Sequence, residues 1–376
     1  MGWWWRKKNK NKNKNKKLIL ERGAKLLEEL IEFGHGKSNP IKFFSANEIR
    51  KATNNLSHSN HVDGFSYYHK WYSGKNENHP MILIKIDFGW WRGEDLVCRD
   101  IAVSSMVSGH KNFMKLVGCC LESVIPVMVY HGVKKHYQLK ISEHPWKRRM
   151  KIAEDIATAL AYLHTEFPRP FVYRILSHWN ILLDEDGVAK LTDFSCCVSI
   201  PEGETFVHVD GTGLESLYNY LNYTDMRSSV VSDKTDVFAF GIFMGLRLLL
   251  GDESFFEPSR RNAKESEGEF DSGMKRLVRN LLSKLKEDRP MEEIAEPKMI
   301  EKMGQISEEE RCQMKAFMML SLRCRGPSEE VPTMVEVAKE LNKIQRSLFN
   351  DSSSLSTGKT QLDSAQDISS TVVLSN

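Results

Sequence analysis

The stretch from residue 171 to residue 195 constrains the fold of this chain more than any other part. It follows residues 146–164 directly, and the apolar positions of that preceding segment recur with a period near 3.6, which predicts a helix. The first part of the stretch reads Phe171-Val172-Tyr173-Arg174-Ile175-Leu176-Ser177-His178-Trp179-Asn180-Ile181-Leu182-Leu183-Asp184. The second part reads Thr192-Asp193-Phe194-Ser195. We expect the functional region of the chain to lie here.

The two parts resemble the catalytic loop and the magnesium loop of protein kinases, H-R-D-x-x-x-x-N and D-F-G. The residues that replace the central ones are Tyr173 for histidine, Ile175 for the catalytic aspartate and Ser195 for the last glycine. Plant receptor-like kinases carry a lysine two positions after that aspartate, where this chain has Ser177. The aspartate normally accepts the proton of the substrate hydroxyl, and isoleucine has no atom that can do so. The resemblance therefore implies a kinase fold without kinase chemistry.

Other segments extend the resemblance over most of the chain. They are Phe44–Ser57 (the lead-in of plant receptor-like kinases), Ile82–Lys85 (V-A-I-K), His110–Glu122, Val129–Gly132 (the hinge) and Asp236–Gly241 (helix F). The resemblance implies an α+β, two-lobed protein-kinase fold over residues 43–348. We expect a small, mostly β lobe with helix C over about residues 43–130, and a large, mostly α lobe over about 134–348.

The nucleotide site keeps only part of its pattern. The glycine-rich loop reads Gly64-Phe65-Ser66-Tyr67-Tyr68-His69, so only the first of three glycines is present. Glycine there lets backbone N–H groups approach the phosphates, and bulky side chains are expected to close the cleft. Leu83 replaces the alanine that normally lies against adenine.

Three polar residues of such a site remain: Lys85, Asn180 and Asp193. With Gly64 they are the candidate nucleotide residues, and Asn180 and Asp193 are the candidate magnesium ligands if ATP binds. The alternative is structural: Lys85 pairs with Asp100, the candidate helix C carboxylate, or with Asp193, while Asn180 bonds its own loop. We expect no required cofactor and at most weak ATP and magnesium binding.

A second pair of positions concerns substrate docking. Related kinases pair a glutamate after the activation segment with a buried arginine, and this chain has Asn219 and Val331 in those places. Stranding one partner of a buried ion pair costs roughly 3–5 kcal/mol, whereas replacing both can be neutral. The joint loss favours a folded chain with a reshaped docking platform. Arg174 could still contact a modified Thr205, Thr212 or Ser216, or could instead bond loop carbonyls.

The basic charge belongs to the amino-terminal tail. Residues 6–17 carry eight Lys/Arg and no acid, so the remainder of a chain with net charge +3 is near −5. Residues 1–17 are predicted to be a disordered tail, or an anchor on an anionic membrane with Gly2 as an acylation candidate. No apolar run is long enough for a transmembrane helix, and the seven cysteines lack metal-ligand spacing, which favours a cytoplasmic, reduced protein.

Residues 18–36 are predicted to form a leading helix that docks on its own domain, with docking on a partner as the alternative. Its apolar stripe consists of Leu20, Ala24, Leu27 and Ile31, and Leu26, Leu30 and Phe33 widen it. Residues 349–376 are rich in Ser, Thr, Asp and Gln and are predicted to be disordered.

Together these motifs resemble the ZED/RKS-type pseudokinases, a clade of plant receptor-like cytoplasmic kinases. The resemblance implies an adaptor or decoy in plant immunity that sits on the leucine-rich repeats of a coiled-coil NLR immune receptor. It also implies sister kinases and bacterial effectors as partners, with the inner face of the plasma membrane as a candidate location and no nucleic acid. The alternatives are a weakly active atypical Ser/Thr kinase and a negative regulator of an active sister kinase.

Overall fold

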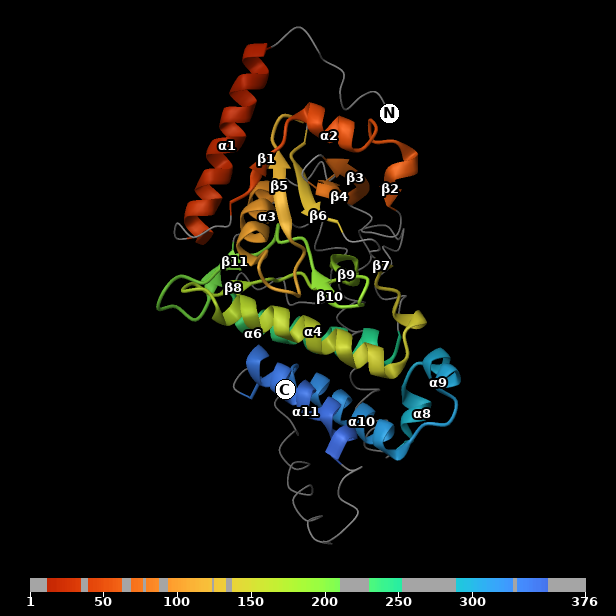
Figure 1. Ribbon diagram of the computed structural model, residues 1–376. Helices are drawn as coiled ribbons and strands as arrows, with labels where there is room; N and C mark the ends of the chain where they lie inside the picture. The colour runs from red at the N-terminus through yellow and green to blue at the C-terminus, as the bar shows by residue number, and fades with distance from the viewer. Residues whose placement is uncertain are drawn as a thin grey trace, which may run out of the picture.

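The computed structural model describes residues 12–34, 40–62, 69–76, 79–87, 94–123, 125–132, 137–209, 230–251, 289–326 and 330–350. A lobe built on a β-sheet stands above a lobe built on helices (Figure 1). The chain therefore has the two-lobed kinase fold that the motifs predict. In the described residues no helix combines the length and apolar character that a membrane crossing requires.

A six-stranded sheet forms the small lobe, in the order β1-β5-β6-β4-β3-β2. Its neighbours are antiparallel except for β1 and β5, which run parallel. The strands are β1 (Lys42–Phe43), β2 (His61–Val62), β3 (His69–Asn76), β4 (His79–Asp87), β5 (Leu116–Cys120) and β6 (Val127–His131).

Alternate residues of β4 enter two different hydrophobic clusters. Leu83 belongs to the cluster that includes helix α3 (Glu94–Val107), whereas Ile82 and Ile84 belong to the cluster that includes α2 (Ala46–Ala52). This division follows from the two-residue period of a strand, which turns successive side chains to opposite faces. Both faces of the sheet are consequently covered, and β4 is held rigidly at the centre of the lobe.

Helix α1 (Lys12–Gly34) lies along α3 at the outer edge of the small lobe (Figure 1). It begins six residues before the predicted start, so residues 12–17 belong to the helix rather than to the tail. It docks on its own domain, as expected for the leading helix. Of its apolar residues Leu26 and Phe33 are buried.

Polar contacts fix α1 in place. The buried Arg22 side chain donates to the carbonyl oxygens of Leu121, at 2.9 Å, and of Ser123, at 2.5 Å. Arg99 of α3 donates to Glu29 at 3.1 and 3.3 Å. At its carboxyl end Phe33 lies 5.5 Å from Phe171 of the large lobe, ring centre to ring centre. Helix α1 thus contacts α3, the sheet and the large lobe.

Helices form the bulk of the large lobe. They are α4 (Trp146–Thr165), α6 (Asp233–Ile242) with its π-helical continuation η4 (Phe243–Leu249), α8 (Met291–Ile294), α9 (Pro297–Met303), α10 (Glu308–Arg323) and α11 (Met334–Asn350). The predicted helix 146–164 is confirmed to within one residue. The last helix, α11, extends to Asn350, two residues into the predicted carboxyl-terminal tail 349–376.

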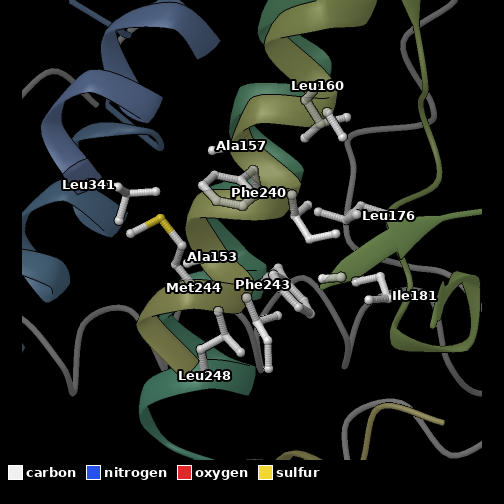
Figure 2. Close-up of a cluster of buried hydrophobic side chains, with 14 of the residues drawn as sticks. Ala153, Ala157, Leu160, Leu176, Ile181, Phe240, Phe243, Met244, Leu248 and Leu341 are labelled. Carbon is white, nitrogen blue, oxygen red and sulfur yellow. The ribbon is translucent and has the colours of Figure 1, made fainter. Parts of the chain in front are cut away.

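The core of this lobe lies where these helices meet the catalytic-loop segment. Ala157 of α4, Phe240 of α6 and Leu341 of α11 face one another in it (Figure 2). Leu176 and Ile181 reach the same cluster from the loop side (Figure 2). The loop is therefore held by apolar packing as well as by its polar contacts.

Short strands frame the loops of the site. They are β7 (Tyr137–Gln138), β9 (Ile181–Leu183) and β10 (Ala189–Leu191) in one sheet, β8 (Phe171–Val172) with β11 (Val198–Ser199), and β12 (Val207–His208) with β13 (Val230–Val231). Strands β8 and β9 flank the catalytic-loop segment, and β10 and β11 flank Asp193. This framing brings the two predicted motifs together.

Candidate functional site: a pseudokinase cleft

Lys85 and Asp100 form a buried ion pair between β4 and α3. The Lys85 ammonium lies 2.7 Å from Oδ2 of Asp100, and both residues are at most 2% exposed. The other oxygen of Asp100 accepts from the Phe194 backbone N–H at 2.9 Å and from the Ser104 hydroxyl at 3.2 Å. Asp100 is confirmed as the helix C carboxylate, and α3 stands in the inward position of a closed kinase.

Asp193, in the magnesium position, has both carboxylate oxygens engaged by side chains of this chain. Oδ1 accepts from the Ser195 hydroxyl at 2.7 Å and lies 3.7 Å from the Lys85 ammonium. Oδ2 lies 3.0 Å from Nε2 of His69. The backbone of Asp193 has a φ of +66°, a left-handed conformation uncommon for residues with a side chain. A magnesium ion would have to displace these contacts.

His69 occupies the third glycine position of the phosphate loop and is the first residue of β3. Its side chain is buried, at 5% exposure of the residue, against the large-lobe aspartate. The expected closing of the cleft by a bulky residue is thus seen at His69. Gly64 and its neighbours Phe65 to Tyr68 lie outside the described residues.

The adenine position is lined by buried apolar residues. Leu83 is 4% exposed and Leu182 of β9 is 1% exposed, and both belong to one buried cluster. Leu182 reaches that cluster from the large lobe. The leucine in the alanine slot therefore joins the two lobes where an adenine ring would lie.

The catalytic loop is anchored as in a kinase, although its residues differ. Asp236 of α6 accepts from the backbone N–H groups of Tyr173, at 2.8 Å, and Arg174, at 2.7 Å, and lies 2.8 Å from Nε2 of His164. The Tyr173 hydroxyl donates to the Thr192 carbonyl at 2.6 Å. Burial raises the pKa of Tyr173 well above its ordinary value, so this phenol stays protonated. The tyrosine replaces a histidine as a structural brace between the two loops.

The positions of the base and of the phosphate lysine have no catalytic capacity. Ile175 is 7% exposed and apolar. The Ser177 hydroxyl accepts from the Trp179 backbone N–H at 3.3 Å, capping the short turn His178–Asn180. The side-chain amide of Asn180 donates a hydrogen bond to the Ile175 carbonyl at 3.5 Å. Asn180 therefore bonds within its own loop, which is the structural alternative predicted for it.

In this arrangement ATP with magnesium would have to displace contacts that the side chains of this chain make with one another. The side chains of His69, Lys85 and Ser195 contact Asp193, and Leu83 is buried in the alanine position beside which adenine would lie. Among the residues described, no group of three or more His, Cys, Asp or Glu side chains could hold a metal ion. Both candidate magnesium ligands, Asn180 and Asp193, make hydrogen bonds or ion pairs with other residues of the chain.

The activation segment is described only in part. Thr205 is exposed, whereas Thr212, Ser216 and Asn219 lie outside the described residues. The Arg174 guanidinium donates to the Cys196 carbonyl at 3.4 Å, and its backbone has a φ of +69°. The loop-capping alternative for Arg174 is therefore observed, and its contact with a modified residue stays a prediction.

Sequence reasoning missed two buried polar pairs in the large lobe. Arg149 of α4 pairs with the buried Glu296, and its other nitrogens donate to the carbonyls of Leu248, at 3.0 Å, and His144, at 2.8 Å. Arg247 of η4 lies 2.6 Å from Nδ1 of His178. Burial, and then the Arg247 charge, lower the pKa of His178 to about 2, so this histidine is neutral. Neither pair had a motif that would have revealed it.

Comparison with known proteins agrees with this geometry. Residues 93–341 match the family described as protein tyrosine and serine/threonine kinase. A probable inactive receptor-like protein kinase of Arabidopsis thaliana is 77% identical over 100% of both chains. Two further Arabidopsis relatives are the non-functional pseudokinases ZRK15, 48% identical over 96% of this chain and 99% of its own, and ZED1, 37% identical over 87% and 96%.

The chain belongs to the ZRK family of kinases.

Within that family it is a pseudokinase. The relatives above are described as inactive or non-functional, and this chain has Ile175, which has no proton acceptor, in the position of the catalytic aspartate. The family resemblance that the motifs imply is confirmed. The chain keeps structural features of the kinase fold: the Lys85–Asp100 ion pair, the hydrogen bonds from the catalytic loop to Asp236, and the apolar core.

Proposed function

We propose that this pseudokinase is an adaptor in plant immunity. It would link effector-modified proteins or sister receptor-like cytoplasmic kinases to a coiled-coil NLR immune receptor, binding the leucine-rich-repeat face of that receptor. The observation that carries the proposal lies in the described residues: the kinase fold is kept, while His69, Lys85 and Ser195 contact the carboxylate of Asp193 in the magnesium position. Such a shell would act through its surfaces, because phosphoryl transfer needs a base, and Ile175 has no atom that can accept a proton.

The proposal requires neither nucleotide nor metal as a cofactor. Asp193 has the contacts that a magnesium ion would otherwise supply, and the Lys85–Asp100 pair keeps α3 inward without a phosphate. The closed state is therefore built into the protein. Partner binding should be the same in the presence and absence of ATP.

The test is reconstitution of the full chain with a coiled-coil NLR receptor and an effector-modified sister kinase. We expect one complex on size-exclusion chromatography, of equal yield in EDTA and in millimolar ATP with magnesium. Failure of the chain to bind the receptor in either buffer would overturn the adaptor proposal. Binding of the sister kinase without receptor, with inhibition of that kinase, would instead support a negative regulator.

One observation favours a second candidate, a weakly active atypical Ser/Thr kinase. The Lys85–Asp100 pair, which active kinases need, is intact at 2.7 Å. The test is incubation of the purified chain with radiolabelled ATP, alone and with a sister kinase. Radiolabel on either protein that disappears in the Asp193→Asn variant would establish phosphoryl transfer.

A further inference from the structure

Helices α1 and α3 lie side by side, and their polar contacts keep one offset along the chain (Figure 1). Lys25 of α1 pairs with Asp95 of α3, 70 positions away. Arg99 donates to Glu29 at 3.1 and 3.3 Å across the same offset of 70 positions. The Arg99 guanidinium also lies 5.4 Å from the centre of the Phe33 ring. Because the partner numbers rise together, the two helices run parallel, and α1 supports α3 at successive turns.

Two neighbouring residues fix how α3 is turned about its axis. Arg99 faces α1 and bonds Glu29, and both side chains are largely shielded from water, at 25% and 12% exposure. Asp100 faces the sheet and pairs with Lys85 of β4 at 2.7 Å. Successive side chains of a helix point about 100° apart, so a rotation of α3 cannot keep both contacts. A movement that withdraws Asp100 from Lys85 therefore also strains the contact with α1.

The buried apolar residues of α1 reach the two lobes where they meet at the cleft. Leu26 belongs to the cluster that also contains Leu83 and Leu182, the residues of the adenine position. Phe33 belongs to the core of the large lobe, and its ring centre lies 5.5 Å from that of Phe171, at the start of the catalytic-loop segment. A displacement of α1 consequently disturbs the packing on both sides of the cleft.

A hydrogen bond from the large lobe holds the carboxyl end of α1. Arg169 donates to the carbonyl oxygen of Glu32 at 3.3 Å. The last carbonyls of a helix have no acceptor role inside the helix and take donors from outside it. Helix α1 is thus attached to α3 along its length and to the large lobe at its end, so it sets the position of α3 from outside the cleft.

We propose that α1 is a built-in clamp on α3, which holds this helix inward and so keeps the Lys85–Asp100 pair formed and the cleft closed. In active kinases the corresponding pair depends on the position of helix C, which regulatory inputs change. Here the input is a part of the same chain, and neither nucleotide nor phosphorylation is needed. The clamp goes beyond the proposed function, since it concerns the inner face of α1 and holds whether or not the chain is an adaptor.

A clamp implies coupling in both directions between the docking of α1 and the closure of the cleft. A coupling free energy is the same from either side, so loosening α1 loosens the cleft, and breaking the Lys85–Asp100 pair loosens α1. A helix that merely covers the lobe produces neither effect. Two probes report the two ends. The buried Cys98 thiol of α3 lies 3.9 Å from the Arg22 carbonyl oxygen of α1, and the Phe194 N–H donates to Asp100 at 2.9 Å.

The first test loosens α1 in the full chain and measures the cleft. The variant is Glu29→Ala with Phe33→Ala, and the readout is hydrogen exchange, by mass spectrometry, of peptides that cover residues 192–197. Exchange there should be at least about fivefold faster than in the wild type. The matched control, Leu20→Ala with Leu27→Ala on the exposed face of the same helix, should leave it unchanged.

The second test breaks the pair from inside the cleft and measures α1. In Lys85→Met, alkylation of Cys98 by iodoacetamide, followed by peptide mass spectrometry, should be at least about fivefold faster than in the wild type. Asp100→Asn, which removes the charge and keeps the size, should act in the same direction. The buried Cys324 of α10 is the internal control and should stay protected in every variant.

Three results would overturn the clamp. The first is equal exchange over residues 192–197 in the Glu29 and Phe33 variant and in its control. The second is unchanged alkylation of Cys98 in both Lys85→Met and Asp100→Asn. The third is acceleration at Cys324 as large as that at Cys98, which would attribute the effect to general unfolding rather than to coupling.

Discussion

His69 and Asp193 lie 3.0 Å apart, from Nε2 to Oδ2, and this contact joins the first residue of β3 to the magnesium position of the large lobe. Each residue is at most 6% exposed. The side chain that replaces a phosphate-loop glycine thus contacts the carboxylate that would hold magnesium. The closed cleft follows from this pair, and it can be tested directly.

Removing the pair should expose the vestigial nucleotide site. We expect no rise in the melting temperature of the wild-type chain in millimolar ATP with magnesium. The double variant His69→Gly and Ser195→Gly should gain a ligand-dependent rise, because Asp193 and Lys85 are released, and the rise follows RT ln(1 + [L]/Kd). The matched control adds Lys85→Ala to the double variant and should lose the gain. A clear rise in the wild type would contradict the closed cleft.

Restoring the base alone should not restore phosphoryl transfer. Ile175→Asp with Ser177→Lys supplies the missing residues, but His69 still contacts Asp193 and Leu83 is still buried in the alanine position beside which adenine would lie. We expect no transfer of radiolabelled phosphate to a generic Ser/Thr substrate. Activity in this variant would mean that the cleft opens readily in solution.

Arg22 should be a main attachment of α1 to the small lobe. Its buried guanidinium satisfies the carbonyls of Leu121 and Ser123, so Arg22→Met should destabilise the chain by about 1–3 kcal/mol. Urea denaturation measures the loss. Leu27→Ala, on the exposed face of the same helix, is the control and should change stability by less than about 0.5 kcal/mol. Equal effects of the two would disprove the assignment of the faces.

The buried pair of Arg149 and Glu296 should show strong coupling. Arg149→Met alone leaves the Glu296 carboxylate buried without its partner and should cost roughly 3–5 kcal/mol. Adding Glu296→Leu should recover the part of that loss that comes from the unpaired carboxylate, whereas the carbonyls of Leu248 and His144 stay without the Arg149 donor. A double-mutant cycle by chemical denaturation checks this, and additive effects would speak against the pair.

His178 should make the protein less stable in acid. Its pKa, about 2 in the fold because of burial and the Arg247 charge, lies below the unfolded value of about 6.5. Between these values the unfolded state binds a proton that the folded state does not, so stability is full above pH 6.5 and falls as the pH decreases. From pH 7 to pH 5 the loss from this group is about 2 kcal/mol.

The measurement for His178 is the free energy of unfolding against pH. His178→Gln should flatten the slope between pH 7 and pH 5. Burial also lowers the pKa of His110 and His144, so a smaller slope of the same sign should persist in the variant. An unchanged slope would show that His178 is not neutral and buried in the folded protein.

The fold, the missing base and the family could be predicted from the amino-acid sequence, because each is carried by local patterns. Ile175, Ser177 and Ser195 stand at fixed distances from one another along the chain, and Lys85 and Asp193 lie in short motifs. The period near 3.6 likewise placed α4 correctly. Such features depend on neighbouring residues and can be read without a structure.

The contacts that these residues make could not be predicted from the sequence and are seen in the three-dimensional structure alone. His69 and Asp193 are separated by 124 positions and Arg149 and Glu296 by 147, and no local pattern specifies pairs so distant. The same holds for α1, where spacing revealed an apolar stripe but not which face is buried. Arg22, a charged residue, lies at the buried face because two carbonyls at the end of β5 and in the following turn accept its hydrogen bonds, and this leaves Leu20, Leu27 and Ile31 in solvent.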